Sequence, residues 1–232
     1  MPFSQQTIDF LFENRLHDSK PWFLDHKADY QTYVKEPFAE FVTALAPTMA
    51  KIDPLIICDP KKISRIYCDA RYAKESIFRE EVWYTFARAR ESAYDGHPGF
   101  WFSIRPGGIS YGCGYYCADS GVKQALRDLI LSDDESFKAA YLAVSSQRTF
   151  KQYGELYKKN RFPDQSPEKC DWLNRKEHGV IFQTDDPAVM FGEGLSRRVA
   201  RDFKKIAPLY GFYLRAEQLA FERRAEGVDN GD

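Results

Sequence analysis

The chain has 232 residues, of which 44% are hydrophobic, 29% charged and 16% aromatic, a composition typical of a globular protein that excludes an intrinsically disordered chain. The formal net charge of −1 gives no overall attraction to nucleic acid or to an anionic membrane. We therefore expect neither of them to be a partner.

Membrane and secretion signals are lacking from the sequence. No stretch approaches the roughly 18 apolar residues of a membrane span, and residues 1–20 lack the basic start and apolar run of a signal peptide. The five cysteines are odd in number and scattered, unlike those of a secreted disulfide scaffold. We therefore expect a cytoplasmic protein with reduced thiols.

The N-terminal part of the chain is predicted to be helical. Ser4 is a suitable N-cap for a helix to about Leu16, because apolar residues recur on one helical face after it. Pro21 suits the first turn of a second helix, which carries Trp22. Pro37 marks a break before a third helix.

Strand-like runs follow in the middle of the chain. Phe100–Ile104 and Ile109–Cys117 flank the turn Pro106-Gly107-Gly108, which predicts a β-hairpin. Residues 150–165 are basic and are predicted to be irregular, whereas Val180–Gln183 is predicted to be a short strand.

Helices return in the C-terminal half. Asp119 is a suitable N-cap for one helix, and either Asp133 or Asp134 for the next. From Leu195 onward the apolar spacing predicts one or two further helices, interrupted near Pro208.

Helices at both ends with strands grouped between them indicate an α+β fold. We expect a single domain over residues 3–224, with a central, mostly antiparallel sheet flanked by the N- and C-terminal helices. Residues 225–232 are predicted to be a disordered tail.

The segment from Arg65 to Lys74 concentrates the polar chemistry of the chain. In an extended strand alternate side chains share one face, which here carries Arg65, Tyr67, Asp69 and Arg71. Guanidinium, ammonium and phenol groups are the donors that a carboxylate or phosphate needs. We therefore predict a small anionic ligand in an oxyanion pocket with two aromatic walls, built from Arg65, Tyr67, Arg71, Lys74, Trp22 and Tyr30.

The sequence leaves open whether this segment is catalytic. In an enzyme, Asp69 or Tyr67 is the candidate for proton transfer, and the cations would stabilise developing negative charge. In the alternative interpretation, Asp69 pairs with Arg65 or Arg71 on a solvated face, as in a non-catalytic module that contacts a protein partner of unknown identity. Residue spacing does not separate the two hypotheses.

Cys113 and Cys117 are spaced so that their thiols would be close together on a helix. The intervening glycine and tyrosines favour a strand, in which the sulfur atoms would lie about 13 Å apart, too far to share an ion. The four histidines show no metal-ligand spacing either. We therefore predict no metal site and no cofactor.

A basic cluster at Lys158, Lys159 and Arg161, with Tyr157 beside it, mixes cations and rings as proteins that bind single-stranded nucleic acid do. A solvated loop explains the cluster more simply. The near-neutral net charge also disfavours a nucleic-acid partner.

The segment from Arg65 to Lys74 resembles the R-x-Y-R-D-x-R-F-[S/A]-K signature of a conserved hypothetical, domain-of-unknown-function family of microbial proteins. The resemblance implies a single α+β domain, but it brings no established activity, cofactor or catalytic residue. Further similar features cover nearly the whole chain: Trp22-Phe23 followed by Lys27 and Tyr30, Ala46-Pro47 to Ile52-Asp53, Pro98-Gly99-Phe100, Pro106-Gly107-Gly108 with Gly114, and Ala207-Pro208-Leu209.

The chain departs from this signature at three places. Cys68 stands where the signature has its second Arg, Tyr72 stands for Phe, and a Lys-rich continuation is replaced by residues 75–79, Glu-Ser-Ile-Phe-Arg. If the family site binds an anion, this chain therefore offers fewer cations from the segment itself.

Overall fold

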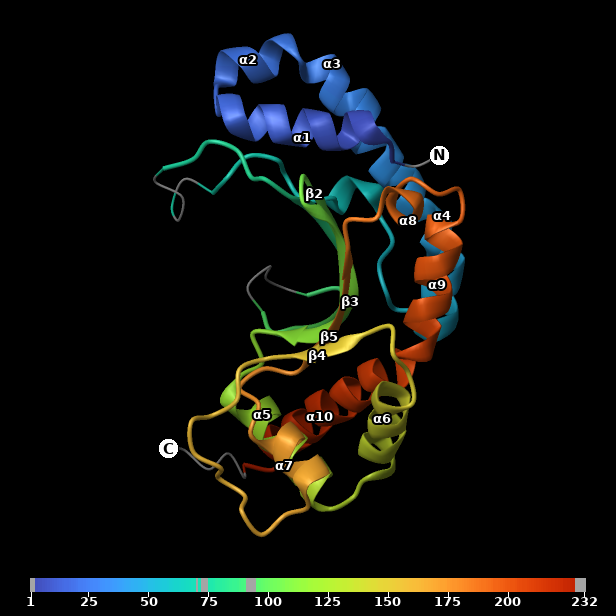
Figure 1. The fold of residues 1–232 in the computed structure, drawn as a ribbon. Coiled ribbons are helices and arrows are strands. Elements are labelled where there is room, and N and C mark those ends of the chain that lie inside the picture. Colours follow the sequence, from blue (N-terminus) through green and yellow to red (C-terminus); the bar gives the residue numbers. More distant parts are fainter. Residues whose placement is uncertain (1–2, 70, 72–74, 91–94, 228–232) are drawn as a thin grey trace. The chain divides into compact units, whose positions relative to one another are not determined.

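The computed structural model describes residues 3–69, 71, 75–90 and 95–227 (Figure 1). By its internal contacts the chain divides into two compact units. Unit 1 comprises Met1–Phe86, Trp101–Tyr111 and Gln183–Arg201, and unit 2 comprises Ala87–Phe100, Gly112–Phe182 and Asp202–Asp232. A single domain over residues 3–224 stays a prediction.

Five strands form one sheet in the order β1-β2-β3-β5-β4. The strands are β1 (Val82–Phe86), β2 (His97–Arg105), β3 (Gly108–Tyr116), β4 (Lys151–Tyr153) and β5 (Gly179–Thr184). The mostly antiparallel sheet and the α+β fold class are confirmed, as is the β2-β3 hairpin around Pro106-Gly107.

The prediction that residues 150–165 are irregular throughout is wrong at its start. Strand β4 pairs antiparallel with β5, with Lys151 opposite Ile181 and Tyr153 opposite Gly179. The tyrosine ring fits there because a Cβ on Gly179 would overlap it. A strand of three residues is too short to show the alternation of apolar and polar residues by which a strand is predicted. Its partner β5 also lies far along the chain, so no local hairpin pattern indicates it.

Helices α1 to α4 and the π-helix η1 belong to unit 1. In chain order they are α1 (Gln5–His17), α2 (Lys20–Asp25), α3 (Lys27–Asp29), η1 (Tyr30–Lys35) and α4 (Glu36–Ile52), followed by the 3-10 turn η2 (Pro60–Lys62). Pro21 lies in the first turn of α2, as predicted. Pro37 lies in the first turn of α4, but the predicted break before it is wrong, because η1 continues directly into α4 with helical backbone at Lys35 and Glu36. The predicted second helix is in fact α2, α3 and η1 in succession, and its π-helical part was not predicted.

The core of unit 1 is aromatic. The ring of Phe102 in β2 stacks on Phe3 at a centroid distance of 5.7 Å and contacts Phe41 at 4.2 Å. Helices α1, α3 and α4 all contact η1, so the π-helix is held among them. Two further helices, α8 (Pro187–Met190) and α9 (Leu195–Lys205), lie later in the chain.

In unit 2, α10 (Ala207–Ala225) packs against both α5 (Ser120–Leu131) and α6 (Glu135–Ser145) (Figure 1). The N-caps Asp119 and Asp134 are confirmed, because each carboxylate accepts a first-turn N–H at 2.8 Å. The short α7 (Pro167–Leu173) contacts α5.

Near the end of the chain, the predicted interruption between two helices is present, but α10 extends to Ala225, the first residue of the predicted tail. Helix α9 ends at Lys205 and α10 begins at Ala207 with Pro208 in its first turn, which confirms the predicted interruption. Residues 228–232 of the predicted tail lie outside the described residues. Among the helices that the structure describes, none combines the length and apolarity needed to cross a bilayer.

Substitution of Gly112 would test how closely β3 approaches β5. A Cβ at this position would overlap the carbonyl oxygen of Val180. We expect Gly112→Ala to lower the free energy of unfolding by about 1–3 kcal/mol or more, because backbone must move to relieve the overlap. Urea denaturation measures this change.

Gly211 in α10 is the matched control, since a Cβ there meets nothing within 4 Å. Gly211→Ala is expected to stabilise the protein by roughly 0.5–1 kcal/mol through helix propensity. Equal stabilities of the two variants would contradict the packing of β3 against β5.

His178 is buried in unit 2, and its Nδ1 has no hydrogen-bond partner among the residues described. Burial lowers the pKa of its imidazole to about 4, and the nearby charges of Arg175 and Arg127 act in the same direction. The folded protein therefore keeps this ring neutral at neutral pH.

This burial predicts a loss of stability in acid. Between the folded pKa of about 4 and the unfolded value of about 6.5, only the unfolded chain binds the extra proton. The free energy of unfolding should therefore fall by about 2–3 kcal/mol from this residue as pH decreases through that window, and be fully retained above it. Urea denaturation across that range should show a shallower pH dependence for His178→Gln, and identical dependences would contradict the burial argument.

Candidate functional site

A cavity of about 590 Å³ lies in unit 1, within the size range of small-molecule sites. We call it the unit 1 pocket. Its apolar lining includes Phe23, Ile63 and Ile66, all of which are buried. Its polar lining includes two phenols, Tyr30 and Tyr67, and four cationic side chains, Lys27, Lys35, Lys61 and Arg65.

The charge of this lining is one-sided. The described lining contains no acidic side chain to balance its four cations. None of the four forms a salt bridge with another residue in the described part of the chain. Lys27, Lys61 and Arg65 are exposed and Lys35 is half-buried, so the positive charge lies around the mouth rather than in the core.

The ring of Phe23 holds the two phenols in place. Phe23 is 4% exposed, and its ring centroid lies 5.5 Å from Tyr30 and 5.4 Å from Tyr67. Phe78 completes the cluster at 5.0 Å from Phe23 and 4.8 Å from Tyr67. Burial raises the pKa of Tyr30 to about 12, so its phenol is a neutral hydrogen-bond donor at physiological pH.

One wall of the pocket is the π-helix η1, which supplies Tyr30, Gln31 and Lys35. Its wider turn bonds residue i to residue i+5, as in the bond from the Glu36 N–H to the Gln31 carbonyl. Residues five apart therefore lie near one another, which brings Lys35 to the same side as Tyr30. The hydroxyl of Thr7 in α1 supports this turn by donating to the Tyr33 carbonyl at 2.6 Å.

The segment 63–67 is another part of the lining. Its residues from Arg65 onward belong to the segment Arg65 to Lys74, which the sequence analysis treated as an extended strand. That assignment is wrong for the described residues of the segment. They belong to no strand of the sheet and form one antiparallel bridge, Tyr67 to Phe78. Two flanking bonds of 2.8 Å complete the pairing, from the Cys68 N–H to the Ile77 carbonyl and from the Arg79 N–H to the Ile66 carbonyl.

Asp18 at the end of α1 holds the partner of this bridge. Its carboxylate accepts from the N–H of Ile77 at 3.0 Å and from the N–H of Phe78 at 2.9 Å. The residue has a left-handed backbone, with φ of 43°, which turns the chain sharply away from the helix. The end of a helix therefore helps to position Tyr67, together with the bonds of 2.9 Å that join Ser64 to Trp83 in β1.

The whole of this site falls within a recognised family. A family model described as a conserved hypothetical protein, DUF2461, matches residues 6–212. The chain belongs to this family. No curated protein matches it. Membership of DUF2461 agrees with the resemblance found in the sequence, and it assigns no activity to the pocket.

The structure brings together three of the six ligand-binding residues predicted for this DUF2461 protein. Arg65, Tyr67 and Tyr30 line the unit 1 pocket. Trp22 is not among the lining residues; its indole lies between the imidazoles of His17 and His26, at 4.8 and 4.1 Å.

The other two predicted cations do not contribute to the pocket as described. Arg71 binds Asp69, with Nε 3.0 Å from Oδ1 and Nη2 2.6 Å from Oδ2, and is not among the lining residues. Lys74 lies outside the described residues. The hydrogen bonds from Arg71 hold the pKa of Asp69 well below its usual range, which makes this carboxylate a weak base for proton transfer.

Sequence reasoning missed three lysines of the site. Lys27, Lys35 and Lys61 come from α3, η1 and η2, so no local pattern joins them to Arg65. Only Lys27 carried a signal, because the sequence analysis placed it after Trp22-Phe23 among the features that resemble the family.

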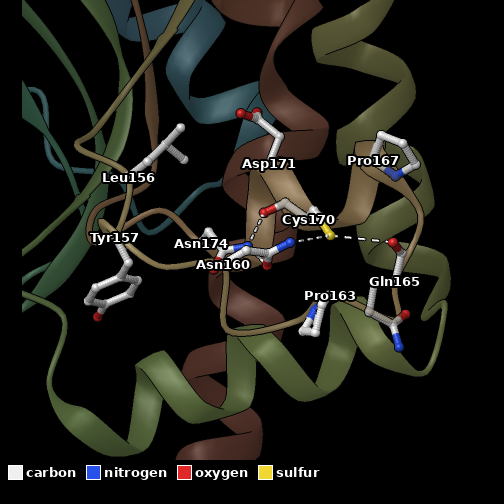
Figure 2. A pocket seen from close by; sticks show the side chains of 9 residues that line it. All are labelled: Leu156, Tyr157, Asn160, Pro163, Gln165, Pro167, Cys170, Asp171 and Asn174. Atoms are coloured by element: carbon white, nitrogen blue, oxygen red, sulfur yellow. Dashed lines mark hydrogen bonds between the residues drawn. The ribbon is translucent and has the colours of Figure 1, made fainter.

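A second cavity, of about 510 Å³, lies in unit 2 between α7 and the loop before it (Figure 2). Asn174 organises it: Nδ2 donates to the Asn160 side chain at 2.7 Å and Oδ1 accepts from the Arg161 N–H at 2.8 Å. The Cys170 thiol donates to the Phe162 carbonyl at 3.0 Å. Asp171 is likewise bound by Arg175, at 2.9 Å. Most polar groups here are thus already bonded to the protein, which makes the unit 1 pocket the stronger candidate site.

Asp18 provides a test of how the unit 1 pocket is positioned. We expect Asp18→Ala to lower the free energy of unfolding by about 1.5–3 kcal/mol, because two N–H groups lose a charged acceptor. Hydrogen exchange should accelerate at the amides of Ile77 and Phe78 in particular. Asp18→Asn, which keeps an acceptor and tolerates the left-handed backbone, should lose less. Unchanged exchange at these two amides in Asp18→Ala would contradict the role given to this carboxylate.

Proposed function

We propose that the unit 1 pocket binds a small organic anion, with a carboxylate or phosphate group at its cationic mouth and an apolar body against Phe23, Ile63 and Ile66. One observation carries this proposal: four cationic side chains line the pocket, with no acidic residue in its described lining. Clustered positive charge without a protein counter-charge attracts anions and concentrates them locally.

The hydrogen-bond donors of the lining support the same conclusion. The Arg65 guanidinium can bind a planar oxyanion with two parallel bonds, and the Tyr30 and Tyr67 hydroxyls can donate to further oxygens. The buried apolar lining offers contact area for the rest of a ligand, at roughly 25 cal/mol for each Å² removed from water. A few polar groups around an apolar cavity are typical of small-molecule sites.

The π-helix supplies independent support. Isolated π-helical turns are rare and occur frequently at functional sites. Here the irregular turn brings Lys35 beside Tyr30, and Thr7 satisfies the Tyr33 carbonyl. Our proposal covers binding; in a catalytic role, proton transfer would fall to Tyr67, because Asp69 is engaged by Arg71.

The free thiols support a proposal for the compartment of the protein. All five cysteines are free: Cys117 is exposed, Cys113 is buried and the other three are half-buried. We propose a reducing, cytoplasmic compartment, where anionic metabolites are abundant ligands.

The proposal is tested by thermal shift against a library of phosphorylated and carboxylated metabolites. A ligand that binds only the folded protein raises the midpoint of unfolding. Hits are then titrated by calorimetry against Arg65→Ala and Lys61→Ala, which we expect to weaken binding by about fivefold to tenfold through loss of one charged contact.

Two cations outside the pocket serve as matched controls. Lys62 follows Lys61 in sequence and Lys51 belongs to the same unit as Arg65, yet neither is among the lining residues. Lys62→Ala and Lys51→Ala should therefore bind the hit with unchanged affinity. Equal weakening by all four substitutions would refute the pocket. A library without a hit would favour the alternative, a module that contacts a protein partner, which affinity capture would then address.

A further inference from the structure

We infer that the anion taken by the unit 1 pocket is a doubly charged phosphate monoester of a compact apolar alcohol rather than a carboxylate. This inference rests on the proposed function and names the ligand class of the same site.

The charge of the lining favours two negative charges on the ligand. A carboxylate carries one charge and is satisfied by a single guanidinium fork, which Arg65 alone can supply. The three lysines would then stay without a counter-charge, because they have no salt-bridge partner among the residues that the structure describes. A phosphate monoester carries about −1.5 to −2 at neutral pH and compensates more of this charge.

The pocket also has more hydrogen-bond donor groups than the two oxygens of a carboxylate can bind. A phosphate monoester has three strong acceptor oxygens, so Arg65, a lysine and a phenol can each bind a different oxygen. Tyr30 is suited to the last role because its buried hydroxyl stays protonated and can donate to an anion without adding charge. Lysine ammonium groups serve as point charges for phosphate, whereas planar carboxylates favour arginine.

The ligand's body is limited by the apolar lining. Phe23, Ile63 and Ile66 are buried, and Tyr67, which is 37% exposed, forms the outer edge. A cavity of about 590 Å³ holds one small body with its headgroup, but not a long chain. No histidine or carboxylate is among the described lining residues of the pocket.

Three probes with the same phenyl body separate the effect of headgroup charge from that of headgroup shape. Phenyl phosphate is doubly charged near pH 7.5, while phenyl sulfate and benzoate each carry one charge. By calorimetry with the full chain, we expect phenyl phosphate to bind about tenfold or more tightly than either of the others. Its affinity should fall about fivefold to tenfold near pH 5, below the second phosphate pKa of about 6, while that of phenyl sulfate stays constant.

Two variants test whether the preference for phenyl phosphate arises in the unit 1 pocket. Lys61→Ala should narrow the preference for phenyl phosphate over phenyl sulfate severalfold, and Lys62→Ala should leave it unchanged. Equal affinities for phenyl phosphate, phenyl sulfate and benzoate would overturn the inference while leaving an anion pocket in place. Absence of binding by all three would also overturn it, and a blank metabolite library would then remove the proposed function as well.

Discussion

The carboxylate of Asp18 is the contact on which the geometry of the candidate site depends. It accepts the N–H groups of Ile77 and Phe78, and through them it holds the short partner of Tyr67 against the end of α1. One isolated bridge is a weak constraint, because few backbone bonds offset the entropy of ordering the segment. A charged acceptor strengthens the constraint, since hydrogen bonds to ionised groups contribute roughly twice as much as neutral ones. Packing of Phe78 on Phe23 then carries the same constraint to Tyr30.

Two arginines of unit 1 that lie six residues apart in sequence, Arg65 and Arg71, differ in whether an acidic residue neutralises them. Arg71 is neutralised by Asp69, so this pair presents little net field to a ligand. Arg65 and the three lysines are not neutralised in this way, and their mutual repulsion is tolerated because most of them reach solvent, where salt screens them. Repulsion among the four cations lowers the stability of the protein without ligand, and a bound anion relieves this repulsion. The clustered charge that slightly destabilises the fold therefore also favours anion binding.

Features encoded by neighbouring residues were predictable from the sequence, and features that depend on distant contacts were not. Asp119 and Asp134 cap their helices through local bonds, and the β2-β3 hairpin needs only its own turn, so both kinds of element were correct. The π-helix needs Thr7 from another helix, and β4 needs β5, so neither left a local signal. The same division holds for the site. Arg65 and Tyr67 stood out by their density of donors, whereas Lys35 and Lys61 join them only through folding.

The two cavities show why volume alone does not indicate a ligand. Their volumes are similar, about 590 and 510 Å³, yet their polar groups differ in what they already bind. In the unit 2 cavity Asn174, Asn160 and Cys170 bond to one another or to nearby backbone, so a ligand would have to replace existing bonds at little net gain (Figure 2). In the unit 1 pocket the four cations have no salt-bridge partner among the described residues, so a bound anion need not displace one of these. Because an unsatisfied charge gains more from a new partner than a satisfied amide does, the balance of bonds already made, rather than the space enclosed, distinguishes the candidate site from a gap in packing.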